Sequence, residues 1–122
     1  MLRNVSLLLL FNKHKEILLQ HRSDDAERLP GYWGFFGGGI EEGETTKQAL
    51  FRESKEELEY VPQNPILIMV QKTDMIGKKY VYMEKYDESV KLYQHEGQAM
   101  RWFSLDKIKD LKMIDHDMEI ID

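Results

Sequence analysis

The chain has 122 residues, which is long enough for one domain with a hydrophobic core but too short for two. It contains no cysteine, so disulfide bonds, thiolate metal sites and cysteine nucleophiles are excluded. The net charge of −5, with 42% hydrophobic and 32% charged residues, indicates an ordinary globular protein and disfavours binding to a nucleic-acid polymer, which requires a basic surface. We therefore expect a single cytoplasmic domain over residues 1–122, with neither a nucleic-acid polymer nor a membrane as its partner.

The first elements predicted along the chain are two short strands joined by a polar turn. Residues 5–11 form an apolar run far shorter than the roughly 20 residues needed to span a bilayer. No small-residue cleavage site of a signal peptide follows this run. Strands near 4–11 and 16–22 are therefore predicted. A polar loop then leads to a third short strand near 33–36.

Three glycines follow, and after them a helix is predicted from Thr45 to about Glu59. The glycines at 37–39 are expected to form a loop, because glycine adopts positive φ without strain. Thr45 or Thr46 can cap the start of the helix. Pro62 disfavours helical geometry just before itself and is the expected stop.

The second half of the chain predicts three more strands and further helical segments. We expect strands near 66–73, 79–86 and 100–103, a helix that opens at Ser104 or Asp106, and a last helical piece near Asp115. The order β-β-β-α-β-β-β-α predicts an α/β (α+β) fold in which helices cover a mixed sheet.

The predicted central helix has an apolar stripe and an acidic face. The stripe follows a spacing of four, four and three residues and consists of Leu50, Ser54, Leu58 and Val61, with Phe51 beside it. Glu53, Glu56 and Glu57 fall at i, i+3 and i+4 and share another face, where they repel one another. A divalent cation reverses the sign of that repulsion, since Mg²⁺ prefers hard oxygen ligands.

An acidic helix face can also be simply solvated, with Lys47, Arg52 and Lys55 as ion-pair partners. The glycines that precede the helix favour a metal site instead. They let backbone groups approach a ligand, and the carbonyl oxygen of Gly37 or Gly38 can become a further ligand.

The glycines and charged residues together resemble the signature of the Nudix hydrolases, the MutT-like family. That signature sets a glycine, a glutamate, an Arg-Glu pair and a Glu-Glu pair at fixed spacings. The matching positions are Gly38, Glu44, Arg52, Glu53, Glu56 and Glu57. Residues 33–35, 96–98 and 102–105 are also similar to segments of the family. The resemblance implies a Nudix-type α/β/α sandwich, with a mixed curved sheet flanked by helices.

The resemblance also implies a Mg²⁺-dependent hydrolase, with Mn²⁺ as a second candidate ion, that cleaves a phosphoanhydride bond by water attack on phosphorus. The substrate would be a nucleoside di- or triphosphate, or a nucleoside diphosphate linked to another moiety. The implied metal ligands are Glu53, Glu56, Glu57, Glu96 and the carbonyl oxygen of Gly37. Glu53 and Glu96 are both candidates for the general base. Arg52 is expected to pair with Glu44 and to orient the catalytic helix. Dimers are frequent in the family, so a homodimer is possible.

Three residues depart from the family pattern, namely Phe36 before the glycines, Ser54 in the apolar stripe and Glu59 at the helix end. A non-glycine residue at positive φ costs about 1 kcal/mol, so we expect the helix to end differently, with Pro62 as the stop. None of the three departures removes an implied metal ligand, and activity is expected to survive them.

Substrate contacts are indicated by residues outside the signature. Arg22 and Arg28 suit bidentate contact with phosphates. Tyr80 and Tyr82 can stack on a base, although alternate aromatic residues in a strand more often pack in the core. The alternative function is a catalytically weak, nucleotide-binding regulatory module of the same fold. Such a module would be expected to lack a glutamate of the set, and none is missing here.

Overall fold

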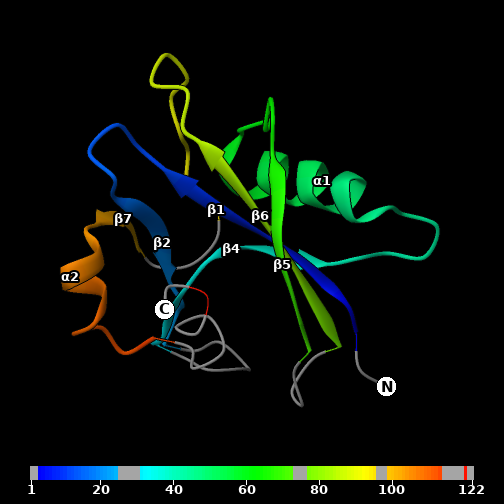
Figure 1. Ribbon diagram of the computed structural model, residues 1–122, viewed down its shortest axis with the longest axis horizontal. Helices are drawn as coiled ribbons and strands as arrows, with labels where there is room; N and C mark the ends of the chain where they lie inside the picture. Colours follow the sequence, from blue (N-terminus) through cyan, green and yellow to red (C-terminus); the bar gives the residue numbers. More distant parts are fainter. Residues whose placement is uncertain (1–2, 25–30, 73–76, 96–98, 114–119, 121–122) are drawn as a thin grey trace.

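The computed structural model describes residues 3–24, 31–72, 77–95, 99–113 and 120 (Figure 1). In chain order its elements are β1 (Val5–Phe11), β2 (Ile17–His21), β3 (Trp33–Gly34), β4 (Phe36–Gly39), α1 (Thr46–Leu58), β5 (Ile66–Lys72), β6 (Lys78–Lys85), β7 (Ala99–Phe103) and α2 (Leu105–Ile108). Every strand and helix predicted as far as α2 is present, but four strands rather than three precede α1, because β3 and β4 replace the single strand expected near 33–36. The helical piece expected near Asp115 lies outside the described residues. The glycines were expected in a loop, which is wrong: they lie in β4, because that segment pairs with the first half of β1.

β1 is the central strand of the sheet. It runs parallel to β6, with Val5 opposite Lys79 and Phe11 opposite Lys85. On its other side it runs antiparallel to β4. β5 pairs antiparallel with β6 and lies at the edge of the sheet. These four strands form the mixed part of the sheet, next to which α1 lies.

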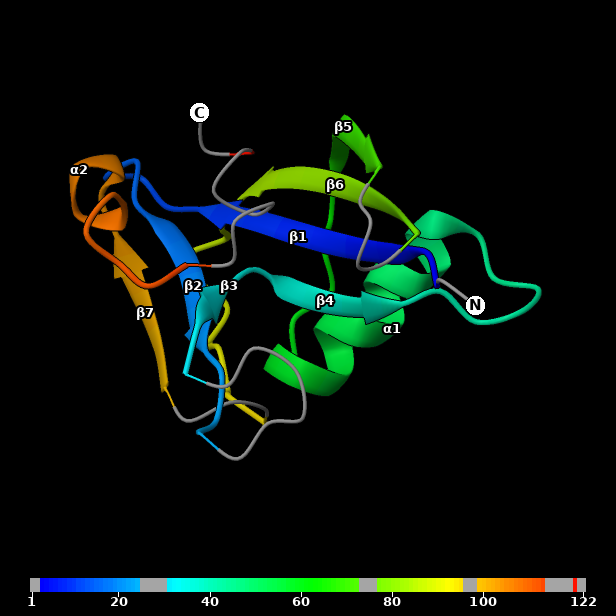
Figure 2. The same ribbon diagram turned by 90° about the horizontal axis from the view of Figure 1, so that it is seen from below.

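A second group of strands forms around β2. Both β3 and β7 pair antiparallel with β2, and β2 joins the first group through the pair Phe11–Ile17. Figures 1 and 2 show β2 and β7 turned away from the direction of β1 and β6, so the sheet is curved. The predicted mixed, curved sheet is confirmed.

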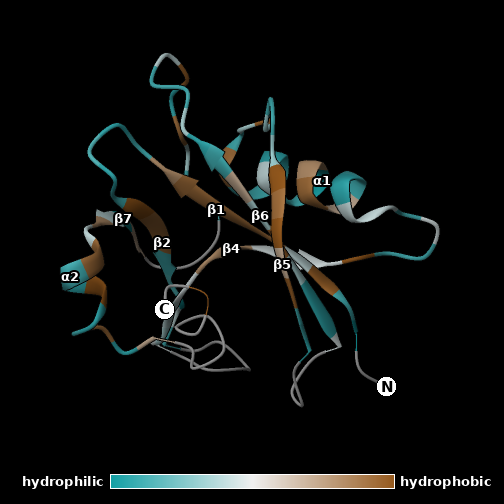
Figure 3. Ribbon diagram, in the orientation of Figure 1, coloured by the Kyte–Doolittle hydropathy of each residue, from teal (hydrophilic) through white to brown (hydrophobic). Residues whose placement is uncertain are grey.

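Apolar side chains cover both faces of the sheet, which explains the continuous apolar run over residues 7–11 of β1. Leu8 packs with Leu50 and Leu58 of α1 on one face, and Leu9 packs with Ile108 of α2 on the other. Figure 3 shows β1 and β2 as largely hydrophobic ribbons between these layers. The two helices therefore cover opposite faces, as the sandwich requires. Within the described ranges, no helix is long and apolar enough to cross a membrane.

α1 begins with a capping box and is tied to two strands. The Thr45 hydroxyl accepts a hydrogen bond from the Gln48 N–H at 3.1 Å, and the Gln48 side chain accepts one from the Thr45 N–H at 2.8 Å. The Ser6 hydroxyl of β1 donates to the Thr46 carbonyl at 2.8 Å. The hydroxyls of Thr46 and Tyr82 lie 2.5 Å apart. The start of the helix is therefore fixed both locally and from the sheet.

The end of α1 differs from the expectation. Glu59 has φ 55° and ψ 34°, a left-handed conformation, and its N–H donates to the Lys55 carbonyl at 3.0 Å. This is the cap geometry that glycine normally adopts at a helix end. The prediction that the helix ends differently, with Pro62 as the stop, is therefore wrong.

The buried stripe of α1 agrees with the prediction in part. Leu50, Ser54 and Leu58 are buried, but Val61 is 47% exposed because α1 ends before it. Glu57 is buried instead, with only 3% of its surface exposed. One residue of the predicted acidic face therefore belongs to the interior.

Candidate active site

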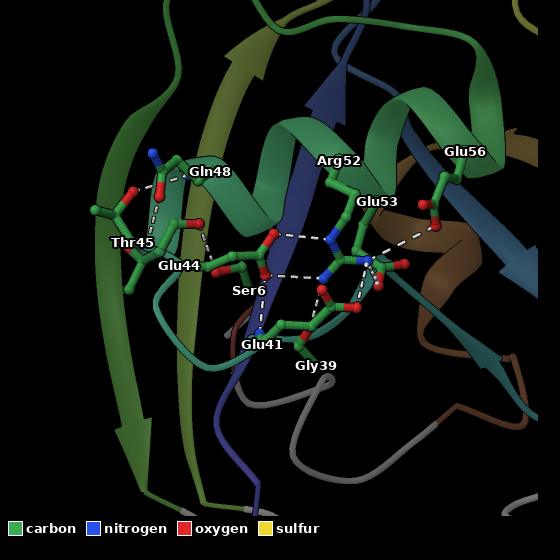
Figure 4. A network of polar contacts seen from close by, with 10 residues as sticks. Ser6, Gly39, Glu41, Glu44, Thr45, Gln48, Arg52, Glu53 and Glu56 are labelled. Atoms are coloured by element: carbon green, nitrogen blue, oxygen red, sulfur yellow. Dashed lines mark hydrogen bonds and ion pairs between the residues drawn. The ribbon is translucent and has the colours of Figure 1, made fainter.

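Arg52, on α1, joins β4 to the acidic residues around it (Figure 4). Its Nε and Nη2 atoms donate to the two carboxylate oxygens of Glu44 at 2.8 and 3.0 Å. Nη2 also donates to the Gly39 carbonyl at 2.9 Å, and Nη1 donates to Oε1 of Glu53 at 2.8 Å. The expected pair of Arg52 with Glu44 is therefore present, and the same guanidinium also holds β4 and Glu53. We call these residues the Arg52 network.

The charges of the Arg52 network reinforce one another. The hydrogen bonds from Arg52 and from the Glu41 N–H lower the pKa of Glu44 to about 2. The bonds to Glu44 raise the pKa of Arg52, although partial burial opposes this. Arg52 Nη1 also lies 3.8 Å from a carboxylate oxygen of Glu41 and 3.7 Å from one of Glu56. One guanidinium thus faces several carboxylates, and the excess negative charge suits a divalent cation.

Two glycines of β4 are required by close approach, and Gly37 also by its backbone conformation. A Cβ atom at Gly38 would lie 2.5 Å from Cδ of Glu53, so the missing side chain leaves the space that this carboxylate occupies. At Gly37, whose φ is 146°, a Cβ atom would lie 2.2 Å from the backbone oxygen of Ser6. Glycine at these two positions therefore lets α1 and β1 lie directly against the backbone of β4.

Glu57 holds the last turn of α1 to β4 from the buried side. Its Oε1 atom accepts a hydrogen bond from the Gly37 N–H at 2.9 Å. Its backbone carbonyl accepts one from the His95 N–H at 2.9 Å. A buried carboxylate is costly unless it is hydrogen-bonded, and the bond from the Gly37 N–H offsets this cost at Oε1.

The acidic residues fit a divalent cation in their chemistry. Glu53 and Glu57 supply hard carboxylate oxygens and lie against neighbouring glycines of β4. The Glu56 side chain is 61% exposed. In the part of the chain that the structure describes, no three His, Asp or Glu side chains are grouped so that they could hold a metal ion. Oε1 of Glu53 instead accepts a hydrogen bond from Arg52. Metal ligation by these glutamates and by the Gly37 carbonyl therefore stays a prediction.

Other residues expected at the site are described only in part. Glu96 and Arg28 lie outside the described residues. Arg22 is half-buried just after β2, and its N–H donates to the Tyr32 carbonyl at 2.8 Å. Its contact with substrate phosphates stays a prediction.

The two tyrosines of β6 follow the packing alternative. Tyr82 is 4% exposed and packs with Leu50 in the core layer beneath α1. Its ring is therefore covered, as the packing alternative expects, and a stacking contact with a base stays a prediction. Tyr80 is half-buried against the same layer.

One part of the site could not be recognised in the sequence. The Tyr93 N–H donates to the Leu58 carbonyl at 3.0 Å, next to the bond between His95 and Glu57. Nε2 of His95 also lies 2.6 Å from Oε2 of Glu59. These contacts depend on the path that the chain takes after β6, and no motif or periodicity indicates them.

Comparison with known proteins identifies a matching family and relatives that cover most of the chain. A family model described as the NUDIX domain matches residues 1–122. An RNA pyrophosphohydrolase of Nitratiruptor sp. is 33% identical over 117 residues, which cover 93% of this chain and 68% of that protein. An RNA pyrophosphohydrolase of Wolbachia pipientis is 30% identical over 122 residues, covering 89% of this chain and 65% of that protein. The chain thus spans about two thirds of the length of these relatives, and 40% of an RNA pyrophosphohydrolase of Haemophilus influenzae.

Solved structures share the fold at lower identity. A MutT structure, from work on Aliivibrio salmonicida and Vibrio cholerae, superposes with a TM-score of 0.83 and 21% identity, covering 98% of this chain and 93% of that chain. The NUDIX domain of Shewanella oneidensis NrtR, complexed with ADP ribose, superposes with a TM-score of 0.82 and 18% identity, covering 99% of this chain and 84% of that chain. These structures support the architecture of the sheet and its helices.

Proposed function

Because the chain belongs to the NUDIX family, we propose that it is a divalent-metal-dependent pyrophosphohydrolase that uses Mg²⁺, or Mn²⁺ in its place. The bond cleaved is a phosphoanhydride of a nucleoside di- or triphosphate, or of a nucleoside diphosphate linked to another moiety. The observation that carries this proposal is the Arg52 network, in which one guanidinium binds Glu44, Gly39 and Glu53 together. It holds the carboxylate of Glu53 over Gly38, beside the point where Glu57 meets Gly37.

A bound divalent cation would neutralise phosphate charge and activate the attacking water. Glu53, Glu56 and Glu57 would supply its oxygen ligands, with the Gly37 carbonyl and Glu96 as further ones. Arg52 would act as a positioning residue, because it fixes the direction of the Glu53 carboxylate. Glu53 and Glu96 remain the two candidates for the general base.

The substrate class is proposed from chemistry and from the names of relatives. Arg22 and Arg28 would contact substrate phosphates, for which the planar guanidinium is suited. The relatives named RNA pyrophosphohydrolase add an RNA with a 5′-triphosphate to the candidates, since the phosphoanhydride bonds of such an RNA lie at that end. The net charge of −5 favours a small nucleotide or conjugate over a polymer. One substrate panel can decide between them.

The test is release of phosphate and pyrophosphate from nucleoside triphosphates, diphosphate conjugates and a 5′-triphosphate RNA, with and without Mg²⁺. In Glu57→Gln, the amide oxygen can still accept the Gly37 N–H, so the fold should be kept while a charged metal ligand is lost. We expect kcat to fall at least about 100-fold, which corresponds to roughly 3 kcal/mol of transition-state stabilisation.

Glu42→Gln is the matched control, because Glu42 is an exposed glutamate of the same acidic stretch. It should turn over like the wild type. Near-normal activity of Glu57→Gln would remove Glu57 from the metal site. Mg²⁺-dependent binding of a nucleotide without turnover of any substrate would identify the regulatory module instead.

A further inference from the structure

The last turn of α1 is held from outside by the segment 93–95. The N–H groups of Tyr93 and His95 donate to the carbonyls of Leu58 and Glu57 at 3.0 and 2.9 Å. These are carbonyls at the helix end, which have no partner within the helix itself. The His95 side chain reaches the next residue, with Nε2 at 2.6 Å from Oε2 of Glu59. We call this set of three contacts the helix-end clamp.

Glu59 occupies a backbone conformation that disfavours it. Its φ of 55° lies in the left-handed region, where a side chain is strained and glycine is not. The side chain is 53% exposed, so burial of apolar surface does not offset this strain. Its contact is with His95, which brings segment 93–95 to the helix end.

We propose that Glu59 and His95 are positioning residues for Glu57. Their pair keeps the His95 N–H on the Glu57 carbonyl. The same glutamate reaches the Gly37 N–H with its side chain at 2.9 Å. Glu57 is thus held at both ends, by the clamp at its backbone and by β4 at its carboxylate. The consequence for catalysis rests on the proposed function, whereas the positioning of Glu57 does not.

Glu59→Gly separates positioning from stability. Glycine adopts the left-handed cap without strain, so the melting temperature should equal or exceed that of the wild type. The clamp loses its side-chain hydrogen bond, and we expect kcat to fall about two- to fivefold, the range that one exposed hydrogen bond can supply, with KM unchanged. A merely structural role would not combine a higher melting temperature with a lower kcat.

Two variants complete the test. Glu59→Gln retains an oxygen that accepts from His95 and should keep the wild-type kcat. Lys15→Gly is the matched control, because Lys15 also has a positive φ, 61°, in the turn between β1 and β2, away from Glu57. It should leave kcat unchanged. An unchanged kcat in Glu59→Gly would overturn the role in catalysis.

Amide hydrogen exchange in metal-free protein gives a readout that needs no substrate. In Glu59→Gly, the amides of His95 and Gly37 should exchange about two- to fivefold faster than in the wild type, but not in Lys15→Gly. Faster exchange at His95 alone would show a clamp that does not position Glu57, and unchanged exchange at both would overturn the proposal. If the wild type turns over no substrate, the proposed function fails and the exchange experiment still decides.

Discussion

α1 is held to the rest of the protein by two different kinds of contact. Along the helix, the Arg52 network joins charged groups that still touch water, since 24% of the Arg52 side chain and 18% of the Glu44 side chain are exposed. Beyond the helix end, the Tyr60 hydroxyl donates to Oε2 of Glu84 at 2.5 Å, and the Asn64 N–H donates to Oε1 at 2.5 Å. Tyr60 and Glu84 are 1% and 7% exposed, so this second contact is buried.

The two contacts differ in whether they contribute mainly to stability or mainly to activity. Burial, together with the bond to Glu84, raises the pKa of Tyr60, so its hydroxyl stays a donor at any physiological pH. A buried donor or acceptor that loses its partner is costly. A partly exposed charge that loses its partner is solvated by water instead. We therefore expect the Tyr60–Glu84 contact to contribute mainly to stability and the Arg52 network mainly to the orientation of Glu53.

The largest loss of stability is expected from Glu84→Ala. This change leaves the Tyr60 hydroxyl and the Asn64 N–H without their acceptor and opens a cavity beside Tyr60. We expect the free energy of unfolding to fall by about 3 kcal/mol, measured by urea denaturation. Activity per folded molecule should stay close to that of the wild type, because Glu84 does not contact the Arg52 network.

Glu84→Gln is the control for the lost volume, since its amide oxygen still accepts one of the two hydrogen bonds. It should cost about 1 kcal/mol. Equal losses in the Gln and Ala variants would show that the carboxylate contributes charge rather than acceptors. If kcat fell together with stability in the Glu84 variants, the Tyr60–Glu84 contact would contribute to activity as well as to stability.

A smaller loss of stability but a larger loss of activity is expected from Arg52→Lys. Lysine keeps the charge but cannot bind Glu44 with two nitrogens while also reaching Gly39 and Glu53. We expect about 1 kcal/mol less stability, because these groups remain partly hydrated. kcat should fall about 100-fold, since a carboxylate misplaced by about 1 Å can cost that much.

Arg101→Lys on β7 makes the same chemical change at an exposed position and should alter neither quantity. If Arg52→Lys retained full kcat, the orientation of Glu53 would not depend on the guanidinium. If Arg52→Lys instead lost as much stability as Glu84→Ala, the Arg52 network would contribute to stability in the same way as the buried Tyr60–Glu84 contact.

Features that depend on neighbours in the chain could be predicted from the sequence. The start of α1 is local, because Thr45 and Gln48 satisfy each other's backbone within one turn. The spacing from Glu44 to Arg52 is also fixed by the helix and the turn before it, and the predicted ion pair is present. The alternation of two buried layers follows from the apolar run in β1.

Features that depend on distant backbone could not be predicted. The need for glycine at Gly38 arises from the Glu53 carboxylate, which only the packing of α1 on β4 brings there. Helical periodicity grouped Glu57 with the exposed acidic residues. The Gly37 N–H that binds its carboxylate lies 20 residues away, and the periodicity of a helix carries no information about such a partner. The left-handed Glu59 was missed since local strain argued against it, and the compensating contact with His95 is far away in sequence.

The smallest effect is a pH dependence that also separates the two contacts. The pKa of Glu44 is lowered from 4.5 to about 2, first by Arg52 and then by the Glu41 N–H. A carboxylate whose pKa is lower in the folded state stabilises the fold above its unfolded pKa, and this stabilisation is lost as the pH falls through its folded pKa. In metal-free protein, the stability advantage of the wild type over Glu44→Gln should therefore shrink between about pH 4.5 and pH 2. Urea denaturation of both proteins over that range measures the difference, in which the other carboxylates cancel. A constant difference would mean that Arg52 binds the protonated carboxyl group of Glu44 as well as the carboxylate, so that hydrogen bonding rather than charge holds the network together.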